Sequence, residues 1–171
     1  MSVFIISCKS EHNQPSDNDD YLILISDIEK STFGYVNSEG DTIIPFEKYA
    51  CCFTDTFKTY AIVTSPEKGY NFICIDRNEN IKYHVFPFDN GPDYVCEGLF
   101  RIIENEKIGY ADSATGEIVI EPQFSCAYPF REGIAEVSYS CEERPIGEYH
   151  EWISNEWFFI DKSGNRIENE K

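Results

Sequence analysis

Short apolar segments that end in Asn or Asp recur along the chain. Four of them share a five-residue pattern and occupy residues 33–37, 72–76, 108–112 and 157–161. Turn-forming residues follow each segment, and an Asn or Asp side chain at its end can accept hydrogen bonds from backbone amides two residues further on. Each copy is therefore predicted to be a β-strand that enters a tight hairpin.

A second strand follows each predicted turn, at residues 42–44, 81–85, 117–120 and, as a short final piece, 166–167. Prolines come after the first three of these strands: Pro45, Pro87 and Pro122. Because proline has no amide hydrogen to donate, we expect each one to end its strand. An apolar residue lies eight positions after each proline and is expected to act as an anchor: Phe53, Val95 and Phe130.

Third strands are predicted where apolar residues resume after these anchors, at residues 57–63, 99–103 and 134–139. Residues 21–25 look like the third strand of a copy whose beginning is missing. A three-stranded unit by itself cannot bury its apolar face, whereas stacked units can. We therefore predict an all-β fold in which about three and a half antiparallel units stack into one domain over residues 21–171. A solenoid, a curled sheet and a barrel-like closure all remain open.

The third copy has the most complete pattern, with Gly109-Tyr110-Ala111-Asp112, Gly116, Ile118-Val119-Ile120, Pro122-Gln123-Phe124 and Phe130-Arg131-Glu132-Gly133-Ile134-Ala135-Glu136-Val137. This order resembles the WG repeat, a β-rich repeat of bacterial proteins, and the similarity covers about residues 21–167. The Trp-Gly pair is intact in none of the copies, which read Phe33-Gly34, Phe72-Ile73, Ile108-Gly109 and Trp157-Phe158. The resemblance implies a β architecture and a binding role, without a shared catalytic site.

One copy is longer than the others. The turn residues Asn37, Asp76, Asp112 and Asp161 are 39, 36 and 49 residues apart, and the surplus lies at 138–152. Insertions in repeat proteins go to loops on one face, often the binding face. The candidate binding residues are therefore those of this insertion: Tyr139, Glu142, Glu143, Glu148, Tyr149, His150, Glu151 and Trp152.

Two interpretations of the insertion are open. As a binding loop, its carboxylates and aromatic rings suit a cationic partner or a metal. As an elongated hairpin, its three aromatic residues pack across the strands while the glutamates face solvent, and this second interpretation is favoured.

Composition narrows the class of function. The 171 residues include 14 Lys and Arg against 31 Asp and Glu, which gives a net charge of −17. Nucleic-acid binding is excluded because phosphate contacts need a basic patch. With 42% hydrophobic residues the chain can close a core, and it has no run of the ~18 apolar residues that span a bilayer.

Signatures of catalysis are missing from the sequence. It contains no nucleophile motif G-x-S-x-G and no phosphate-binding loop. Residues 76–80 begin like a calcium loop, but Ile81 and Pro87 stand where a Gly and a bidentate Glu are needed, so no metal or other cofactor is assigned. We expect a non-catalytic module that binds a protein partner. The alternative is an enzyme that acts on glycan or peptide with carboxylates of 141–151.

The N-terminal segment 1–20 offers two interpretations. Its apolar residues 3–6 followed by Ser7 and Cys8 resemble the end of a bacterial lipoprotein signal, but a signal needs a basic leader and an apolar core of about 7–15 residues. Either the true start lies upstream and Cys8 carries a lipid anchor in the cell envelope, or the run is an ordinary first strand of a cytoplasmic protein.

The cysteines are seven in number. Without Cys8 the other six can pair, yet none of the spacings is C-x-x-C. Reduced, buried thiols are the preferred interpretation for Cys51, Cys52, Cys74, Cys96, Cys126 and Cys141.

Overall fold

The computed structural model describes residues 21–65, 71–147 and 149–168. These residues form antiparallel strands and no helix, which confirms the predicted all-β class. Across the same ranges, no helix is long and apolar enough to cross a membrane. Segment 1–20, with the predicted lipidation site Cys8, lies outside the described residues.

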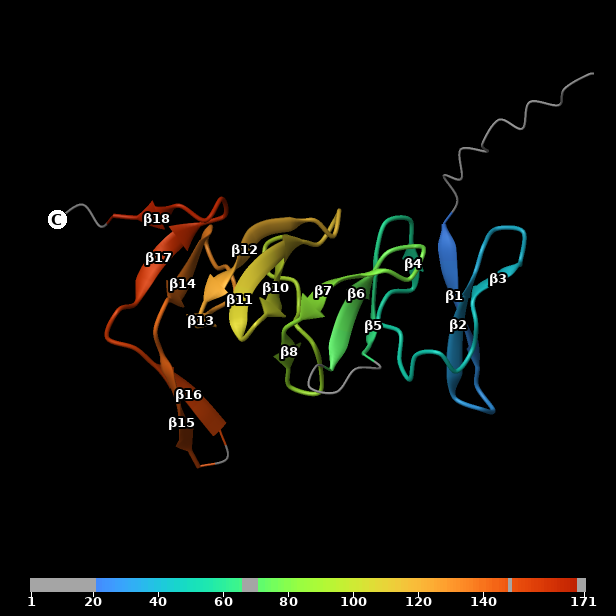
Figure 1. The fold of residues 1–171 in the computed structure, drawn as a ribbon, viewed down its shortest axis with the longest axis horizontal. Helices are drawn as coiled ribbons and strands as arrows, with labels where there is room; N and C mark the ends of the chain where they lie inside the picture. Colours follow the sequence, from blue (N-terminus) through green and yellow to red (C-terminus); the bar gives the residue numbers. More distant parts are fainter. Residues whose placement is uncertain (1–20, 66–70, 148, 169–171) are drawn as a thin grey trace, which may run out of the picture.

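Three sheets follow one another along the long axis of the molecule (Figure 1). The first has the order β3-β2-β1-β4, with β1 at Leu22–Asp27, β2 at Thr32–Val36, β3 at Thr42–Ile44 and β4 at Thr56–Phe57. The second has the order β12-β11-β10-β7-β6-β5. Its strands are β5 at Ala61–Thr64, β6 at Phe72–Ile75, β7 at Ile81–Val85, β10 at Leu99–Glu104, β11 at Lys107–Asp112 and β12 at Ile118–Phe124. The third has the order β13-β14-β17-β18, with β13 at Cys126–Ala127, β14 at Ile134–Ser138, β17 at Phe158–Asp161 and β18 at Arg166–Ile167.

Two ribbons complete the described strands. The second copy contributes β8 (Pro87–Phe88) paired with β9 (Gly91–Pro92), and the insertion contributes β15 (Glu142–Ile146) paired with β16 (Tyr149–Ile153). The predicted elongated hairpin in the insertion is thus confirmed.

The internal repeat explains the strand order. The third strand of one copy pairs with the first strand of the next, in β1–β2, β5–β6, β10–β11 and β14–β17. Each three-stranded unit therefore spans the junction between two copies. The units form a row and do not close into a barrel (Figure 1).

The predicted turn chemistry holds in all four copies. Asn37 Oδ1 accepts hydrogen bonds from the amides of Glu39 and Asp41, at 3.1 and 2.8 Å. Asp112 Oδ1 accepts bonds from the amides of the second and third residues after it, at 2.9 and 2.8 Å. Equivalent bonds form at Asp76 and Asp161.

Buried side chains form three clusters, one after another along the row. The cluster at the C-terminal end combines Leu99 of the second copy, Tyr110 and Phe130 of the third and Ile160 of the fourth. Because each cluster draws on neighbouring copies, no copy can bury its apolar residues alone.

Two strand predictions are wrong. The expected strand 57–63 is divided, since β4 pairs with β1 while β5 begins the next sheet. This is where the chain crosses from the first sheet to the second. Pro122 does not end its strand, because β12 lies at the edge of its sheet and passes the proline in an irregular, bulged register, where a missing amide donor is tolerated.

The predicted anchors behave differently from one another. Phe130 is buried with 1% exposure, but Phe53 and Val95 are 41% and 54% exposed. The prediction of an anchor therefore holds in the third copy only, where Phe130 packs edge-on against Tyr110 at 4.8 Å between ring centroids.

The preference for reduced, buried cysteines is wrong for two of them, because Cys126 and Cys141 form a disulfide. Cys51, Cys52 and Cys96 are free but only partly buried, while Cys74 is buried. Burial raises the pKa of Cys74 to about 11, so this thiol stays protonated at neutral pH.

The second position of the five-residue motif is glycine in the first and third copies, because the second strand of the copy passes very close to it. A Cβ atom on Gly109 would collide with the Ile120 carbonyl oxygen and lie 2.6 Å from the Pro122 nitrogen, and one on Gly34 would lie 2.8 Å from the Ile44 carbonyl oxygen. In the second copy Ile73 takes this position and pairs regularly with His84. A side chain there excludes the close approach, and the chain leaves the sheet after β7 to form the β8–β9 ribbon.

Candidate functional site

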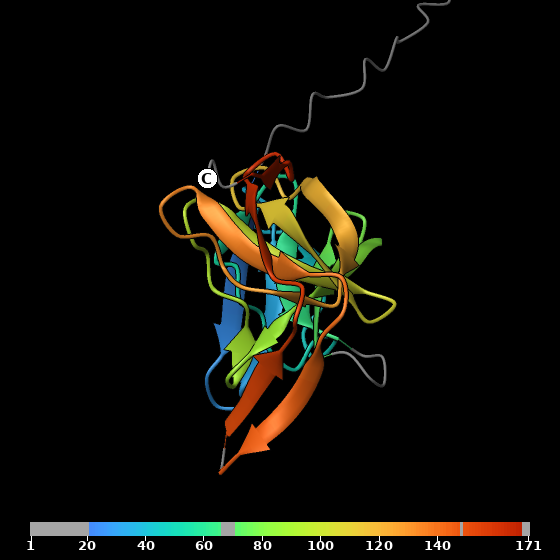
Figure 2. The same cartoon turned by 90° about the vertical axis from the view of Figure 1, so that its left-hand side faces the viewer.

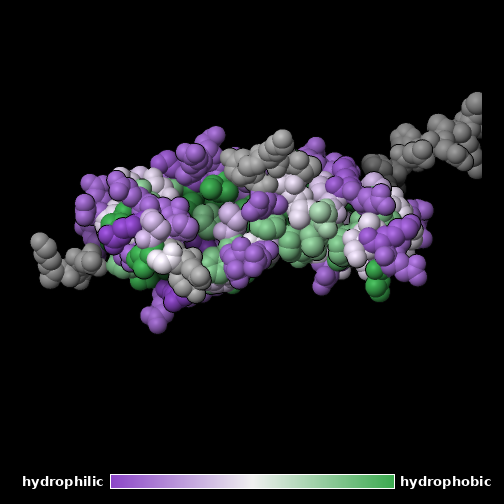
Figure 3. Space-filling view, turned by 90° about the horizontal axis from the view of Figure 1, so that it is seen from below, coloured by the Kyte–Doolittle hydropathy of each residue, from purple (hydrophilic) through white to green (hydrophobic). Residues whose placement is uncertain are grey.

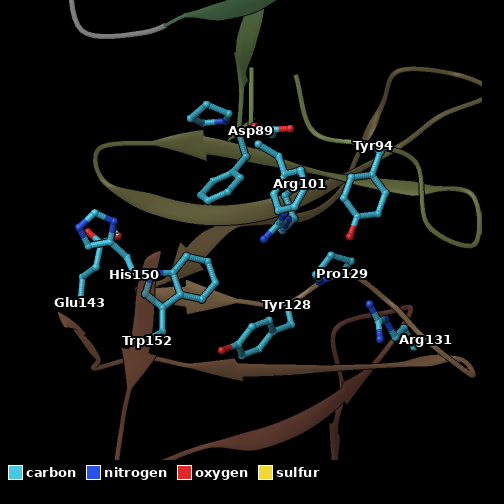
Figure 4. A pocket seen from close by; sticks show the side chains of 12 residues that line it. Asp89, Tyr94, Arg101, Tyr128, Pro129, Arg131, Glu143, His150 and Trp152 are labelled. Atoms are coloured by element: carbon cyan, nitrogen blue, oxygen red, sulfur yellow. Dashed lines mark ion pairs between the residues drawn. The ribbon is translucent and has the colours of Figure 1, made fainter. Parts of the chain in front are cut away.

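A cleft of about 830 Å³ lies between the β8–β9 ribbon and the β15–β16 hairpin. The hairpin projects from the row of sheets (Figure 2). Seen from below, the molecular surface is mostly hydrophilic with hydrophobic patches between (Figure 3). Three segments far apart in the sequence line the cleft, namely 86–94, 128–131 and the hairpin, together with Arg101 (Figure 4).

The register of the hairpin decides which of its residues face the cleft. Glu143 lies opposite Trp152 and Pro145 opposite His150. Side chains alternate between the two faces of a strand, so these four share one face, and Glu143, His150 and Trp152 line the cleft. Glu142 and Glu151 belong to the other face, where Glu151 forms an ion pair with Arg144 at 3.5 Å.

Aromatic rings form much of the cleft wall. The Trp152 ring packs against Phe86 and Tyr128, with centroid distances of 6.0 and 5.4 Å. Across the cleft, Phe88 packs edge-on against Tyr94 at 5.0 Å. Phe88 and Tyr94 are 48% and 42% exposed, which leaves much of their apolar surface in contact with solvent.

A buried ion pair supports this wall from beneath. Arg101 Nε and Nη2 donate to the two carboxylate oxygens of Asp93, at 3.0 and 2.6 Å, and Nη1 donates to the Ala127 carbonyl at 3.2 Å. The guanidinium also lies 4.3 Å from the centroid of the Phe86 ring. Bidentate pairing of this kind fixes orientation as well as adding energy, so Arg101 holds the ribbon against the third copy.

The tyrosine of the repeat positions the opposite wall. Tyr110 Oη donates to the carbonyl of Tyr128 at 2.6 Å, and Tyr35 makes the corresponding bond to Thr54 at 2.7 Å in the first copy. Burial raises the pKa of Tyr110 and of Tyr128, so both hydroxyls stay protonated at neutral pH.

Opposite charges lie toward the two ends of the cleft. Glu143 and His150 stand together at one end, with 3.9 Å between Oε1 and Nδ1, and Arg131 stands at the other (Figure 4). Within the ranges that the structure describes, the Arg131 guanidinium has no ion-pair or hydrogen-bond partner. Between the two ends, Trp152, Tyr128 and Pro129 form a largely apolar surface.

The base of the hairpin is held by covalent and polar contacts. The disulfide joins Cys141, immediately before β15, to Cys126 in β13. Ser154, immediately after β16, lies 2.8 Å from Ser138 Oγ and donates to the Ser140 carbonyl at 2.6 Å. These contacts fix one wall of the cleft relative to the third sheet.

The structure brings together only part of the predicted site. Of the candidates, Glu143, His150 and Trp152 line the cleft, while Glu142 and Glu151 are exposed on the other face. Tyr139 packs instead against Phe124 and Phe158, so the predicted aromatic packing across the hairpin strands is wrong for Tyr139 and Trp152. Glu148 and the side chain of Tyr149 lie outside the described part.

Sequence reasoning missed the second copy's share of the cleft, notably Phe86, Phe88, Tyr94 and Arg101. One signal was present: Ile73 replaces the repeat glycine in that copy alone among the three complete ones. Among the described residues, no three His, Cys, Asp or Glu side chains are grouped to hold a metal ion, and residues 76–80 form an ordinary turn.

Comparison with known proteins identifies the third copy of the repeat. Residues 108–139, which run from β11 through β14, match the family model described as WG containing repeat. The third copy is therefore a WG repeat, and this matched copy supplies both Tyr128 and Arg131 to the cleft. Neither the curated proteins nor the solved structures include one that matches the chain.

Proposed function

We propose that this WG-repeat chain is a non-catalytic binding module whose partner, a protein, occupies the cleft between the second copy and the insertion. The observation that carries the proposal is the group of partly exposed aromatic rings on a rigid support. Binding sites concentrate their energy in a few aromatic and arginine side chains held in place before the partner arrives. Here the Arg101–Asp93 pair and the disulfide supply that support.

The arrangement of carboxylates favours binding over catalysis. Glycan hydrolysis by the usual route needs two carboxyl groups flanking the scissile bond. Of Glu142, Glu143 and Glu151, only Glu143 faces the cleft, and its neighbour there is His150. The enzyme expected from the sequence, with both carboxylates from 141–151, is therefore not favoured, and the other carboxylate of the lining, Asp89, comes from the turn between β8 and β9.

The test compares two phenylalanines of similar exposure. Phe88 lies in the cleft and Phe53 lies outside it, with exposures of 48% and 41%. Proteins are recovered from extracts of the native cells by pull-down with three forms of the chain: intact, Phe88→Ala and Phe53→Ala. We expect one set of proteins to be retained by intact chain and Phe53→Ala and lost from Phe88→Ala. Identical recovery by all three would contradict the proposal.

A further inference from the structure

We propose that the occupant of the cleft is an extended, proline-rich peptide segment with a basic residue toward one end and an acidic residue toward the other. This inference rests on the proposed function and adds the chemistry of the partner. Three features of the cleft lead to it: the aromatic walls, the buried arginine whose donors are already used, and the separated charges.

The aromatic walls suit a polyproline II segment. Grooves lined by aromatic side chains bind such segments because the peptide is already extended and loses little conformational entropy on binding. In this cleft, the exposed faces of Phe88, Tyr94 and Trp152 come from two sides, so an extended chain can contact rings along its length. Proline also has no backbone amide hydrogen that would need a partner against an apolar wall.

The buried arginine beneath the wall is not available to a glycan. A sugar loses solvent from many hydroxyl groups on binding, and each that finds no partner carries a cost. The strongest donor beneath the wall, Arg101, already uses Nε, Nη1 and Nη2 on Asp93 and Ala127. Other polar groups of the lining are Asp89, the hydroxyls of Tyr94 and Tyr128, and the charged groups at the two ends, so oligosaccharide probes belong in the experiment.

The charges at the two ends give the peptide a direction. Glu143 favours a Lys or Arg side chain near it, and Arg131 favours an Asp or Glu side chain. Both residues are exposed, so their pairs are screened and add modest affinity. Their main effect is on specificity, because a reversed peptide would place like charges together at both ends.

The experiment titrates the full chain with labelled synthetic peptides of equal length, followed by fluorescence anisotropy. One peptide has a proline-rich core with Arg before it and Asp after it, a second has the two charges exchanged, and a third replaces the prolines of the better binder by Ala. Oligosaccharides of chitin and cellulose serve as the glycan probes.

We expect one charge order to bind more tightly, and the loss of prolines or the change Phe88→Ala to weaken it by about tenfold or more. The double variant with Glu143→Arg and Arg131→Glu is expected to prefer the other charge order. Both substitutions are on the surface, and circular dichroism checks that the fold is kept.

Equal binding of the proline and alanine peptides, indifference of the double variant to charge order, or saturable binding of an oligosaccharide in the cleft would each overturn the inference. If no peptide binds but Phe88→Ala still loses its cellular partner, the ligand chemistry is wrong and the proposed function stands. If Phe88→Ala keeps both its peptide binding and its cellular partner, the proposed function itself fails.

Discussion

Single residues decide how closely the strands of a unit approach. At Gly109 the neighbouring atoms are all backbone atoms of residues 120–122, which cannot rotate away as a side chain could. Because the same kind of contact occurs at Gly34, the repeat needs glycine where the backbone of the second strand comes this close to the first. In the copy that has Ile73, the strand leaves the sheet and supplies the ribbon of the cleft.

Gly109→Ala should lower the free energy of unfolding by roughly 1–3 kcal/mol, since an added methyl group forces backbone shifts. Gly91→Ala is the matched control, because a Cβ there meets nothing within 4 Å and its φ is not in the left-handed region. Urea unfolding of both variants checks this. A Gly109→Ala variant as stable as the control would contradict the proposed contact.

The buried Arg101–Asp93 ion pair beneath the cleft is expected to stabilise the fold. Asp93→Ala leaves the Arg101 guanidinium, 4% exposed, without its counter-charge, and we expect a loss of about 3–5 kcal/mol in unfolding free energy. Glu151→Ala breaks the exposed pair with Arg144 and should change stability by less than about 0.5 kcal/mol. Similar losses for the two variants, again by urea unfolding, would show that the buried pair does not support the fold.

At the scale of elements, local patterns predict strands well and contacts between segments poorly. The five-residue motifs and their Asx turns depend on neighbouring residues, so strands 72–76, 81–85 and 108–112 could be predicted closely. The division of 57–63 depends on which sheet each half joins. The cleft depends on 86–94 meeting a hairpin about 50 residues later, which no spacing in the sequence encodes. The sequence therefore pointed to the hairpin and missed its counterpart.

The disulfide predicts a redox effect on this hairpin. Cys126 and Cys141 are 15 residues apart, and a loop of that size corresponds to ~3 kcal/mol of stabilisation in the chain-entropy model. A reductant should lower the stability of the intact chain by up to this amount and leave Cys141→Ser unchanged, as followed by urea unfolding. Cys51→Ser, which removes a free thiol, should respond like the intact chain.

Peptide mapping after alkylation provides the direct check on this disulfide. Without reductant, Cys126 and Cys141 should resist labelling in the denatured chain, whereas Cys51, Cys52, Cys74 and Cys96 should react. Labelling of Cys126 and Cys141 under these conditions would contradict the covalent link.

At the scale of the whole molecule, the stacked units create a cleft that no single copy contains. The row of sheets places the second copy's ribbon beside the insertion of the third, and shared buried clusters keep neighbouring copies together. The net charge of −17 repels nucleic acid and other acidic surfaces over the molecule at large. The cleft differs from this surface in its aromatic rings and in Arg131.

Site-specific photo-crosslinking tests whether a protein partner occupies the cleft. A photoreactive phenylalanine analogue is placed at position 88 in one sample and at position 53 in another, and each is irradiated in extracts of the native cells. If a protein partner occupies the cleft, position 88 yields a discrete protein adduct and position 53 yields none. No adduct at position 88, or the same adducts at both positions, would contradict it.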